Sequence, residues 1–457
     1  MNTVLERIAQ RALGGAVVTV ADHRAAEEAI ADTLACMVAG QNDVATQSVR
    51  QGADLTEQGG KATLVGGGSA TAPMAALVNG TSAHALDFDD NFTPGMSHAS
   101  AVLVPALLAL GESRGASGTE LVRAYLVGLE AQALVGHGVA SEHYAAGWHG
   151  TSTIGTIGTA AGCAVLMELG HEETVQAMSL AVSMASGMKG QFGTAAKPFH
   201  AGLAARNAVE AAQFAASGLF GRADILERAQ GFGSLMGGGA EADWSGIDDC
   251  PGHVIGRVGL SPKIHPCCGS THNAVDMVIA LRREHGFQAR EVAEVVLTVG
   301  RANYRNLAYP DPVTVMEARF SMQYCVALAL MQDRLSLSDF QDQAIRRPQL
   351  RDLFTRISMQ VVPREEEKDR QRTAHRVKIW LQDGREFSAS LANPRGTLAN
   401  PLDAATWLAK IQDCFNYAGV PFQMADQALL GGIEAQPDLK ALTALIGRSA
   451  GVQKATG

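Results

Sequence analysis

Two apolar segments, residues 72–78 and 101–110, bound a short interval that is rich in titratable side chains. The titratable residues of this interval are His84, Asp87, Asp89, Asp90 and His98. Carboxylates are costly to bury unless they are paired or hydrogen-bonded, and titratable groups with shifted pKa values gather at functional sites. The interval therefore predicts an acid–base site held between buried segments. The alternative is a helix-capping turn, because Asp and Asn are also common cap and turn residues.

A second candidate segment runs from Tyr144 through His149 into a helix that is expected to begin near Thr151. The start of a helix offers unpaired N–H groups and the positive end of the helix dipole, which together suit a carboxylate ligand. The alternative is that Tyr144 and Trp148 are packing residues.

A third segment places Lys197 directly before Pro198, with His200 close behind. Proline suits the first position of a helix, so Lys197 is expected at the mouth of that helix, where it adds a point charge to an anion-binding end. Flanking residues are apolar, which favours function over the surface position usual for lysine. We expect Lys197→Ala to keep the fold and lose activity.

A fourth segment begins at Lys263 and ends at His272. Cys267, Cys268 and His272 resemble metal ligands, but no second cysteine pair at a suitable spacing completes a structural zinc set. We therefore predict no metal here, and a histidine near a helix start that exchanges a proton.

The elements that must position these groups fall into two regions. Up to residue 262, apolar residues recur at three- and four-residue steps, as helices require; the clearest stretches are 25–37, 121–135, 175–184 and 204–214. Residues 61–68 are a strand-like run among glycines, which we assign to a loop. A phosphate cradle, the alternative, lacks its Gly-Lys-Ser/Thr ending.

After residue 262 the pattern changes. Residues 292–299 alternate at period two, and Asp383-Gly384 is a hairpin signal between two further strands, 376–382 and 385–391. Residues 318–330 read as a buried helix, and 364–370 as a solvated charged run. The tail becomes helical again at 404–414 and 437–446.

The predicted fold class is mainly α. A large helical domain is built from both chain ends, residues 1–262 and 401–457, and a smaller α+β domain spans 263–400. A chain of 457 residues suits two or three domains.

The amino-acid composition limits the classes of molecule that the protein can bind and the compartment in which it is expected. Hydrophobic residues make up 47% and charged residues 18%, as in a well-buried globular protein. A formal charge of −9 without a Lys/Arg-rich run argues against nucleic acid. Residues 145–167 carry no charge, but their histidine and glycines favour a buried helix over a membrane span. Seven scattered cysteines and no signal-peptide pattern predict a reducing, cytoplasmic location.

Taken together, these segments resemble the MmgE/PrpD family over nearly the whole chain. The motifs that carry the resemblance occur in order: Asn79-Gly80, His84 to Asp90, Ser97-His98, Gly147-Trp148-His149, Lys197 to Gly202, Cys268 to His272 and Ala318 to Ser321. The resemblance implies a large helical domain, a smaller α+β lid, a homodimer, a small di- or tricarboxylate substrate and neither metal nor organic cofactor.

The same resemblance implies the site. The family's active-site pattern maps onto Asp87, His98, Lys197 and His272, to which we add Tyr144 as a proton-transfer candidate. The expected substrate-binding residues are Asn91, His149, Thr151, His200 and Lys263.

Family members include 2-methylcitrate dehydratase, cis-aconitate decarboxylase and iminodisuccinate epimerase. In the decarboxylases a threonine stands four positions after the aspartate, where this chain has Asn91. The chain looks most similar to the epimerases, which predicts removal and return of the proton at an α-carbon. A lyase of the same family and a catalytically silent helical binding protein are the alternatives.

Overall fold

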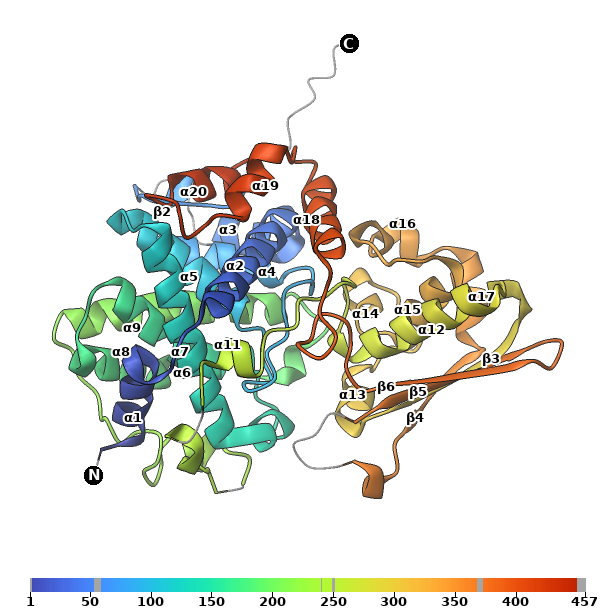
Figure 1. Ribbon diagram of the computed structural model, residues 1–457, viewed down its shortest axis with the longest axis horizontal. Helices are drawn as coiled ribbons and strands as arrows, with labels where there is room; N and C mark the ends of the chain where they lie inside the picture. Colours follow the sequence, from blue (N-terminus) through green and yellow to red (C-terminus); the bar gives the residue numbers. More distant parts are fainter. Residues whose placement is uncertain (1, 53–58, 240, 249–250, 368–372, 450–457) are drawn as a thin grey trace, which may run out of the picture. The chain divides into compact units, whose positions relative to one another are not determined.

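The computed structural model describes residues 2–52, 59–239, 241–248, 251–367 and 373–449. The chain divides into two compact units, which Figure 1 colours along the sequence. The first unit comprises Met1–Pro262 and Cys414–Gly457, and the second comprises Lys263–Asp413. The fold is mainly helical with one small mixed sheet, as the sequence predicts.

Helices make up most of the first unit. They are α1 (Val4–Gln10), α2 (Val20–Gly40), α3 (Val44–Gly52), α4 (Ala72–His84), α5 (Ser100–Arg114), α6 (Gly118–Ala145), α7 (Gly150–Leu166), α8 (His171–Met184), α9 (Ala196–Ala216), α10 (Phe232–Met236), α11 (Val254–Arg257), α19 (Met424–Leu430) and α20 (Lys440–Ile446). The late helices α19 and α20 pack against the early helix α2, so the two chain ends share one core.

Local signals account for several helix boundaries. A capping box at Thr19 and Asp22 starts α2, and another at Ser117 and Glu120 starts α6, so each satisfies backbone N–H groups that have no partner within the helix. Gly115 ends α5 in the left-handed conformation, which glycine adopts without a steric penalty.

Residues 61–68 form more than a loop. Strand β1 (Ala62–Thr63) pairs antiparallel with β2 (Ser69–Ala70), and the glycines between them adopt positive φ angles. The assignment to a loop was therefore incomplete, because the glycine run makes the turn of a short hairpin.

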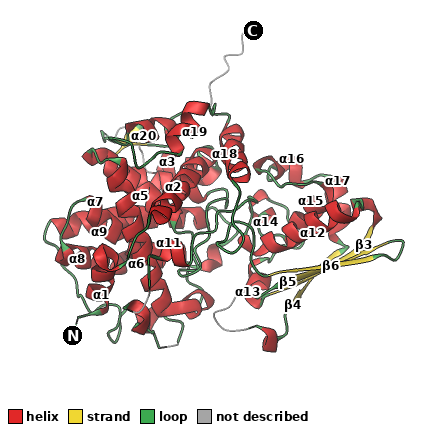
Figure 2. Cartoon of the chain, viewed as in Figure 1, coloured by secondary structure: helices red, strands yellow, loops and turns green. Residues whose placement is uncertain are grey.

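The second unit is built on a four-stranded sheet in the order β4-β3-β5-β6, drawn in yellow in Figure 2. The strands are β3 (Val292–Val299), β4 (Ile357–Val361), β5 (His375–Leu381) and β6 (Glu386–Leu391). Strand β3 pairs parallel with β4 and antiparallel with β5, and β5 pairs with β6 across the predicted Asp383-Gly384 turn.

Helices of the second unit cover this sheet. They are α12 (His272–His285), α13 (Arg301–Asn306), α14 (Val315–Ala318), α15 (Met322–Met331), α16 (Asp342–Ile345) and α17 (Pro348–Phe354). Helix α12 packs on β5 and β6, and α15 on β4. Buried and more exposed residues alternate along β5, as a sheet with one covered face requires.

One prediction about the second unit needs correction. The helix expected at 318–330 is divided, because Ser321 caps a new helix by accepting a hydrogen bond from the N–H of Tyr324. The compact unit runs to Asp413, within α18 (Ala404–Ala418). Arg334 holds the first half of α18 there through a hydrogen bond to the Ala409 carbonyl at 3.1 Å.

The charged run 364–370 is described only in part. Arg364–Glu366 form a short 3-10 helix, whereas residues 368–370 lie outside the described residues. Along the described parts of the chain, no helix combines the length and the apolar character needed to cross a bilayer.

Candidate active site

The candidate site lies where α4 ends and α9 begins, in the first unit. These helices cross very closely, since a Cβ atom on Gly202 would stand 2.1 Å from the carbonyl oxygen of Leu77, and one on Gly80 would stand 2.9 Å from the Cα of Gly202. Glycine on both helices therefore permits the approach that brings His84, at the end of α4, beside Lys197, in the first turn of α9.

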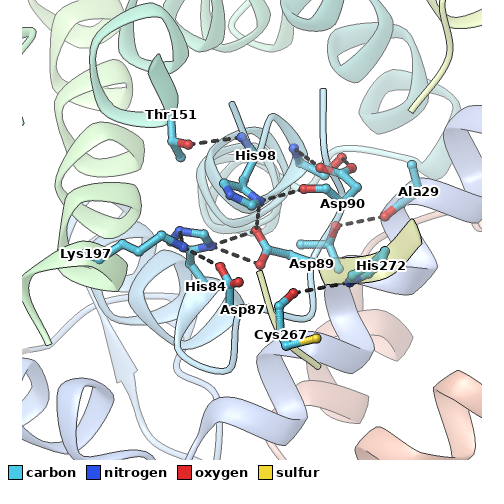
Figure 3. A network of polar contacts seen from close by, with 12 residues as sticks. Ala29, His84, Asp87, Asp89, Asp90, His98, Thr151, Lys197, Cys267 and His272 are labelled. Atoms are coloured by element: carbon cyan, nitrogen blue, oxygen red, sulfur yellow. Dashed lines mark hydrogen bonds and ion pairs between the residues drawn. The ribbon is translucent and has the colours of Figure 1, made fainter. Parts of the chain in front are cut away.

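Lys197 lies at one edge of the polar network in Figure 3, beside His84 and Asp87. Its side chain is 3% exposed, forms an ion pair with Asp87 and donates a hydrogen bond to Nε2 of His84 over 2.9 Å. Helix α9 begins at Ala196, so Lys197 lies inside the first turn and Pro198 one residue further along, not at the first position as expected. A buried, paired lysine is the arrangement expected of a functional group rather than of a surface residue.

His84 links this lysine to a second carboxylate. Its Nδ1 lies 2.9 Å from both carboxylate oxygens of Asp89, and both side chains are fully buried. Because Nε2 accepts from Lys197, the proton resides on Nδ1, which donates to Asp89. Burial lowers the pKa of His84 further than the neighbouring Asp89 raises it, so the imidazole is neutral.

His98 is held from three directions. Its Nδ1 donates to the carbonyl of Asp90 over 2.7 Å and lies 3.4 Å from Oδ2 of Asp89, while its backbone N–H donates to Oγ1 of Thr151 over 3.0 Å. Its ring centroid is 4.4 Å from that of His84. In the neutral ring the proton is therefore on Nδ1 and the lone pair on Nε2, which is the form a general base needs.

His149 and His200 extend the cluster. Their Nδ1 atoms lie 3.2 Å apart, and the ring of His149 stacks on that of His84 at 5.9 Å. Burial lowers the pKa of His149 well below its ordinary value and that of His200 to about 4, with further lowering from the charge of Lys197. Both imidazoles are therefore neutral beside the buried lysine.

The buried side chain of Asp90 belongs to the same network through different partners. Ser100 donates hydrogen bonds to its carboxyl group, and the Ser100 hydroxyl is 2.7 Å from the phenol oxygen of Tyr125. Burial raises the pKa of Asp90 to about 7, with smaller contributions from the charges of Asp89 and Asp32, against the hydrogen bonds from Ser100. Its backbone carbonyl orients His98.

The backbone at Asp87 is in the left-handed region, with φ of 52°. Such a conformation is uncommon outside glycine, although Asp tolerates it better than most residues. It turns the chain immediately after α4, so that Asp87 reaches Lys197 while Asp89, two positions on, reaches His84. Met96, on the same segment, is also left-handed, as are Glu168 and Gln230 elsewhere in the chain.

Thr151 is where the sequence placed it, in the first turn of α7, and its hydroxyl accepts from the His98 backbone. Asn91 instead pairs its backbone with Ser261, each N–H donating to the other residue's carbonyl at 2.9 Å. Tyr144 lies at the end of α6, where the amine of Lys189 stands 3.3 Å from its ring centroid. Their expected functions stay predictions.

Lys263 and His272 belong to the second unit. Lys263 is 1% exposed and His272 is 3% exposed, at the first position of α12. Nε2 of His272 lies 3.3 Å from the carbonyl of Cys267, and its ring meets that of His265 edge-on at 5.1 Å. Both residues are positioned by their own unit, and their part in the site stays a prediction.

Three members of the network are not among the predicted site residues: His84, Asp89 and Asp90. All three were visible in the opening interval as titratable groups. What singles them out is their relation in space, since His84 and Asp89 are five residues apart and are joined only because the chain reverses at Asp87.

The chemistry of the cluster also bears on metal binding. Among the residues that the structure describes, His84, Asp87, Asp89 and His98 offer ligand atoms within 4.8 Å of one another. The amine of Lys197, however, contacts His84 and Asp87, two of these four. A lysine cation therefore takes the place in which a metal would neutralise the carboxylates, and the group does not fit a resident metal well.

Comparison with known proteins gives this arrangement a context. The model of the MmgE/PrpD N-terminal domain matches residues 8–245, and that of the MmgE/PrpD C-terminal domain matches residues 265–428. The chain belongs to the MmgE/PrpD family. The two matches meet close to the division between the compact units at Pro262 and Lys263.

Curated relatives of this MmgE/PrpD protein carry a single activity in their names. Cis-aconitate decarboxylase of Mus musculus is 30% identical over 302 residues, which cover 63% of this chain and 61% of the mouse protein. The Homo sapiens enzyme of the same name is 30% identical, with 63% and 61% covered. That of Aspergillus terreus is 24% identical, and the match covers 80% of each protein. The match therefore spans less than two thirds of the mammalian relatives.

Proposed function

We propose that this MmgE/PrpD protein is an acid–base enzyme, without a cofactor, that acts at the carbon next to a carboxylate of a small di- or tricarboxylate. The observation that carries the proposal is the buried Lys197, which contacts Asp87 and His84 amid neutral histidines. A fixed positive charge in a site that excludes water stabilises negative charge that develops in a transition state, without solvent having to reorganise.

Proton transfer in this site falls to the histidines. Loss of a proton or of CO₂ at such a carbon leaves negative charge on the adjacent carboxylate, which Lys197 neutralises. Nε2 of His98 is the acid–base atom, because Asp90 and Thr151 fix its ring and its tautomer. Asp89 holds His84 in the tautomer that accepts from Lys197, and so positions the lysine.

For the reaction itself we propose epimerisation of an amino- or imino-dicarboxylate of the iminodisuccinate type. Epimerisation needs two proton-carrying groups that act on opposite faces of one carbon. We assign these two groups to His98 and His149, whose ring centroids lie 4.4 and 5.9 Å from that of His84. His272 and Tyr144 are the other candidates for the second group.

Decarboxylation of a tricarboxylate is the second candidate. Its support is the name shared by the curated relatives, at 24–30% identity. It needs only one proton donor, after the carboxylate has left. Asn91 stands where the resemblance places a threonine in decarboxylases, which favours the first candidate.

Proton NMR in deuterated water separates the candidates. The protein is incubated with iminodisuccinate, cis-aconitate or 2-methylcitrate. Deuterium entering the α-carbon of an intact skeleton supports epimerisation, whereas released CO₂ with a new vinyl signal supports decarboxylation, and loss of water from 2-methylcitrate indicates a dehydratase. If no acid changes, the catalytic proposal is wrong and the silent binding protein is the better account.

A further inference from the structure

A cavity of about 390 Å³ is lined entirely by residues of the second unit. It is lined by α12, by the segment before α12, by the loop after α15 and by the first half of α18. Its charged lining residues are Arg283, Arg334, Arg395, Lys410, Asp276 and Asp333. The volume lies within the range that small-molecule sites occupy.

The charge of this cavity is positive on balance. Four cationic side chains line it against two carboxylates. One of the two carboxylates, that of Asp333, is exposed and already paired. It forms ion pairs with Arg282 and with Arg283, whose Nε lies 3.3 Å from Oδ1 of Asp333. Lys410, by contrast, is only 2% exposed. Walls of low dielectric strengthen the attraction of such a recess for an anion.

The buried part of the lining carries unused hydrogen-bonding atoms. Nε2 of His265 lies 3.1 Å from Oδ1 of Asp276, and their side chains are 4% and 10% exposed. Among the described residues, Oδ2 of Asp276 and Nδ1 of His265 have no hydrogen-bond partner, although both atoms are buried. Buried polar atoms are rarely left unsatisfied, because a buried atom without a partner has lost its hydrogen bonds to water and gained none in the protein.

Asp276 is ionised in this setting. Burial acts to raise its pKa, but the hydrogen bond from His265 and the charges of His265, His272 and Arg395 together lower it. An ionised carboxylate oxygen can only accept hydrogen bonds, so a ligand that binds at Oδ2 of Asp276 must carry a hydrogen-bond donor. The guanidinium of Arg395, which donates to Oγ1 of Thr406 over 3.2 Å, is fixed on the wall beside it.

We propose that this cavity binds a small oxyanion that still carries a hydroxyl hydrogen, namely hydrogen phosphate or a phosphate monoester in its singly protonated form. Arg283, Arg395 and Lys410 neutralise its charge, and Oδ2 of Asp276 accepts its O–H. Sulfate, which has the same shape but no proton at neutral pH, presents lone pairs to the Asp276 carboxylate and is rejected. The apolar residues Ile264 and Ile279, which also line the cavity, leave room for the organic part of an ester.

Isothermal titration calorimetry on the full chain tests this directly, independently of any catalytic activity. Inorganic phosphate, glycerol 3-phosphate and sodium sulfate are titrated in a buffer that lacks all three. We expect phosphate to bind at least about 10-fold more tightly than sulfate, the range of discrimination that one charged hydrogen bond gives. Tighter binding of glycerol 3-phosphate than of phosphate identifies an ester as the ligand, and weaker binding identifies free phosphate.

Three variants complete the test. Asp276→Asn supplies an amide donor, so sulfate is expected to bind within about 3-fold of phosphate, and Arg395→Gln is expected to weaken both anions about 10-fold or more. Arg24→Gln removes the same charge from an exposed arginine of α2 and should leave binding unchanged. The proposal is overturned if millimolar phosphate gives no heat, if sulfate binds wild type equally well, or if Arg24→Gln weakens binding as much as Arg395→Gln. Circular dichroism checks that each variant folds.

Discussion

At the scale of single residues, Lys197 determines how the candidate site is held together and what it does. The lysine and Asp87 are both almost fully buried, so the charge of each is stabilised by the charge of the other. This changes the expectation from the sequence, in which Lys197→Ala was to leave the fold untouched. A buried carboxylate without its cation costs stability as well as activity.

Lys197→Met is therefore expected to lower kcat/KM by about 10²–10³-fold and the free energy of unfolding by roughly 3–5 kcal/mol. The double variant Lys197→Met/Asp87→Asn removes both charges and should recover most of the stability but none of the activity. Urea unfolding and steady-state kinetics on the same preparations separate the two effects. Wild-type kinetics in either variant would remove the lysine from the site.

Asp90 gives the protein a dependence on pH whose sign follows from its surroundings. Its pKa rises from 3.8 when unfolded to about 7 in the folded chain, so between these values only the folded state keeps the proton. Its contribution to stability is therefore present at low pH and is lost as the pH rises towards and through about 7.

The Asp90→Asn variant isolates the effect of Asp90 on stability. The nearby histidines, whose pKa values are lowered, make stability rise with pH, but they do so in both proteins and cancel in the comparison. From pH 5 to pH 8, wild type is expected to lose about 2–3 kcal/mol of unfolding free energy relative to the variant. Urea titrations at both pH values measure the difference. Parallel pH profiles for the two proteins would show that Asp90 is ionised throughout.

At the scale of elements, the crossing of α4 and α9 is what brings the site residues together. An alanine at Gly202 would place its Cβ 2.1 Å from the Leu77 carbonyl and 2.3 Å from Oγ1 of Thr81, so the helices must separate. Because His84 and Lys197 lie on the two helices, their separation also lengthens the hydrogen bond between them.

Gly202→Ala is accordingly expected to cost about 1–3 kcal/mol of stability and to reduce turnover. Gly52→Ala is the matched control: Gly52 lies in α3 with nothing within 4 Å of a Cβ position, so it should be neutral or slightly stabilising. Thermal unfolding and activity assays report both. If both variants had the same stability and the same activity, the close crossing of α4 and α9 would not be what holds the site residues in place.

Among the helices and strands, those with local sequence signals were predicted correctly. Strand β3 was predicted residue for residue, and the β5–β6 hairpin to within a residue, because alternation and an Asp-Gly turn are local signals. The join between His84 and Asp89 was not predicted, since it depends on the positive φ of Asp87, and no local signal announces that conformation. The placement of Lys197 beside His84 depends on a helix crossing between residues 113 positions apart.

At the scale of the whole molecule, the resemblance to the family implies a homodimer. The segment that follows α9 bears the exposed apolar side chains Leu219 and Phe220, 52% and 80% exposed, and Phe214 at the end of α9 is 47% exposed. Exposed apolar residues gathered in one segment are typical of surfaces that bind another protein.

Multi-angle light scattering is expected to give about twice the chain mass of 47.9 kDa. Replacing Leu219 and Phe220 with serine should shift the mass towards that of one chain if this segment forms the contact. A wild-type mass of one chain at micromolar concentration would contradict the expected dimer.

The central claim is that the buried lysine, two carboxylates and histidines of the first unit hold a substrate carboxylate. A crystal structure of the protein with a bound dicarboxylate tests this most directly. We predict one carboxylate within hydrogen-bonding distance of Nζ of Lys197 and a reacting carbon within reach of Nε2 of His98. A dicarboxylate bound elsewhere, with Lys197 still contacting only Asp87 and His84, would contradict the account.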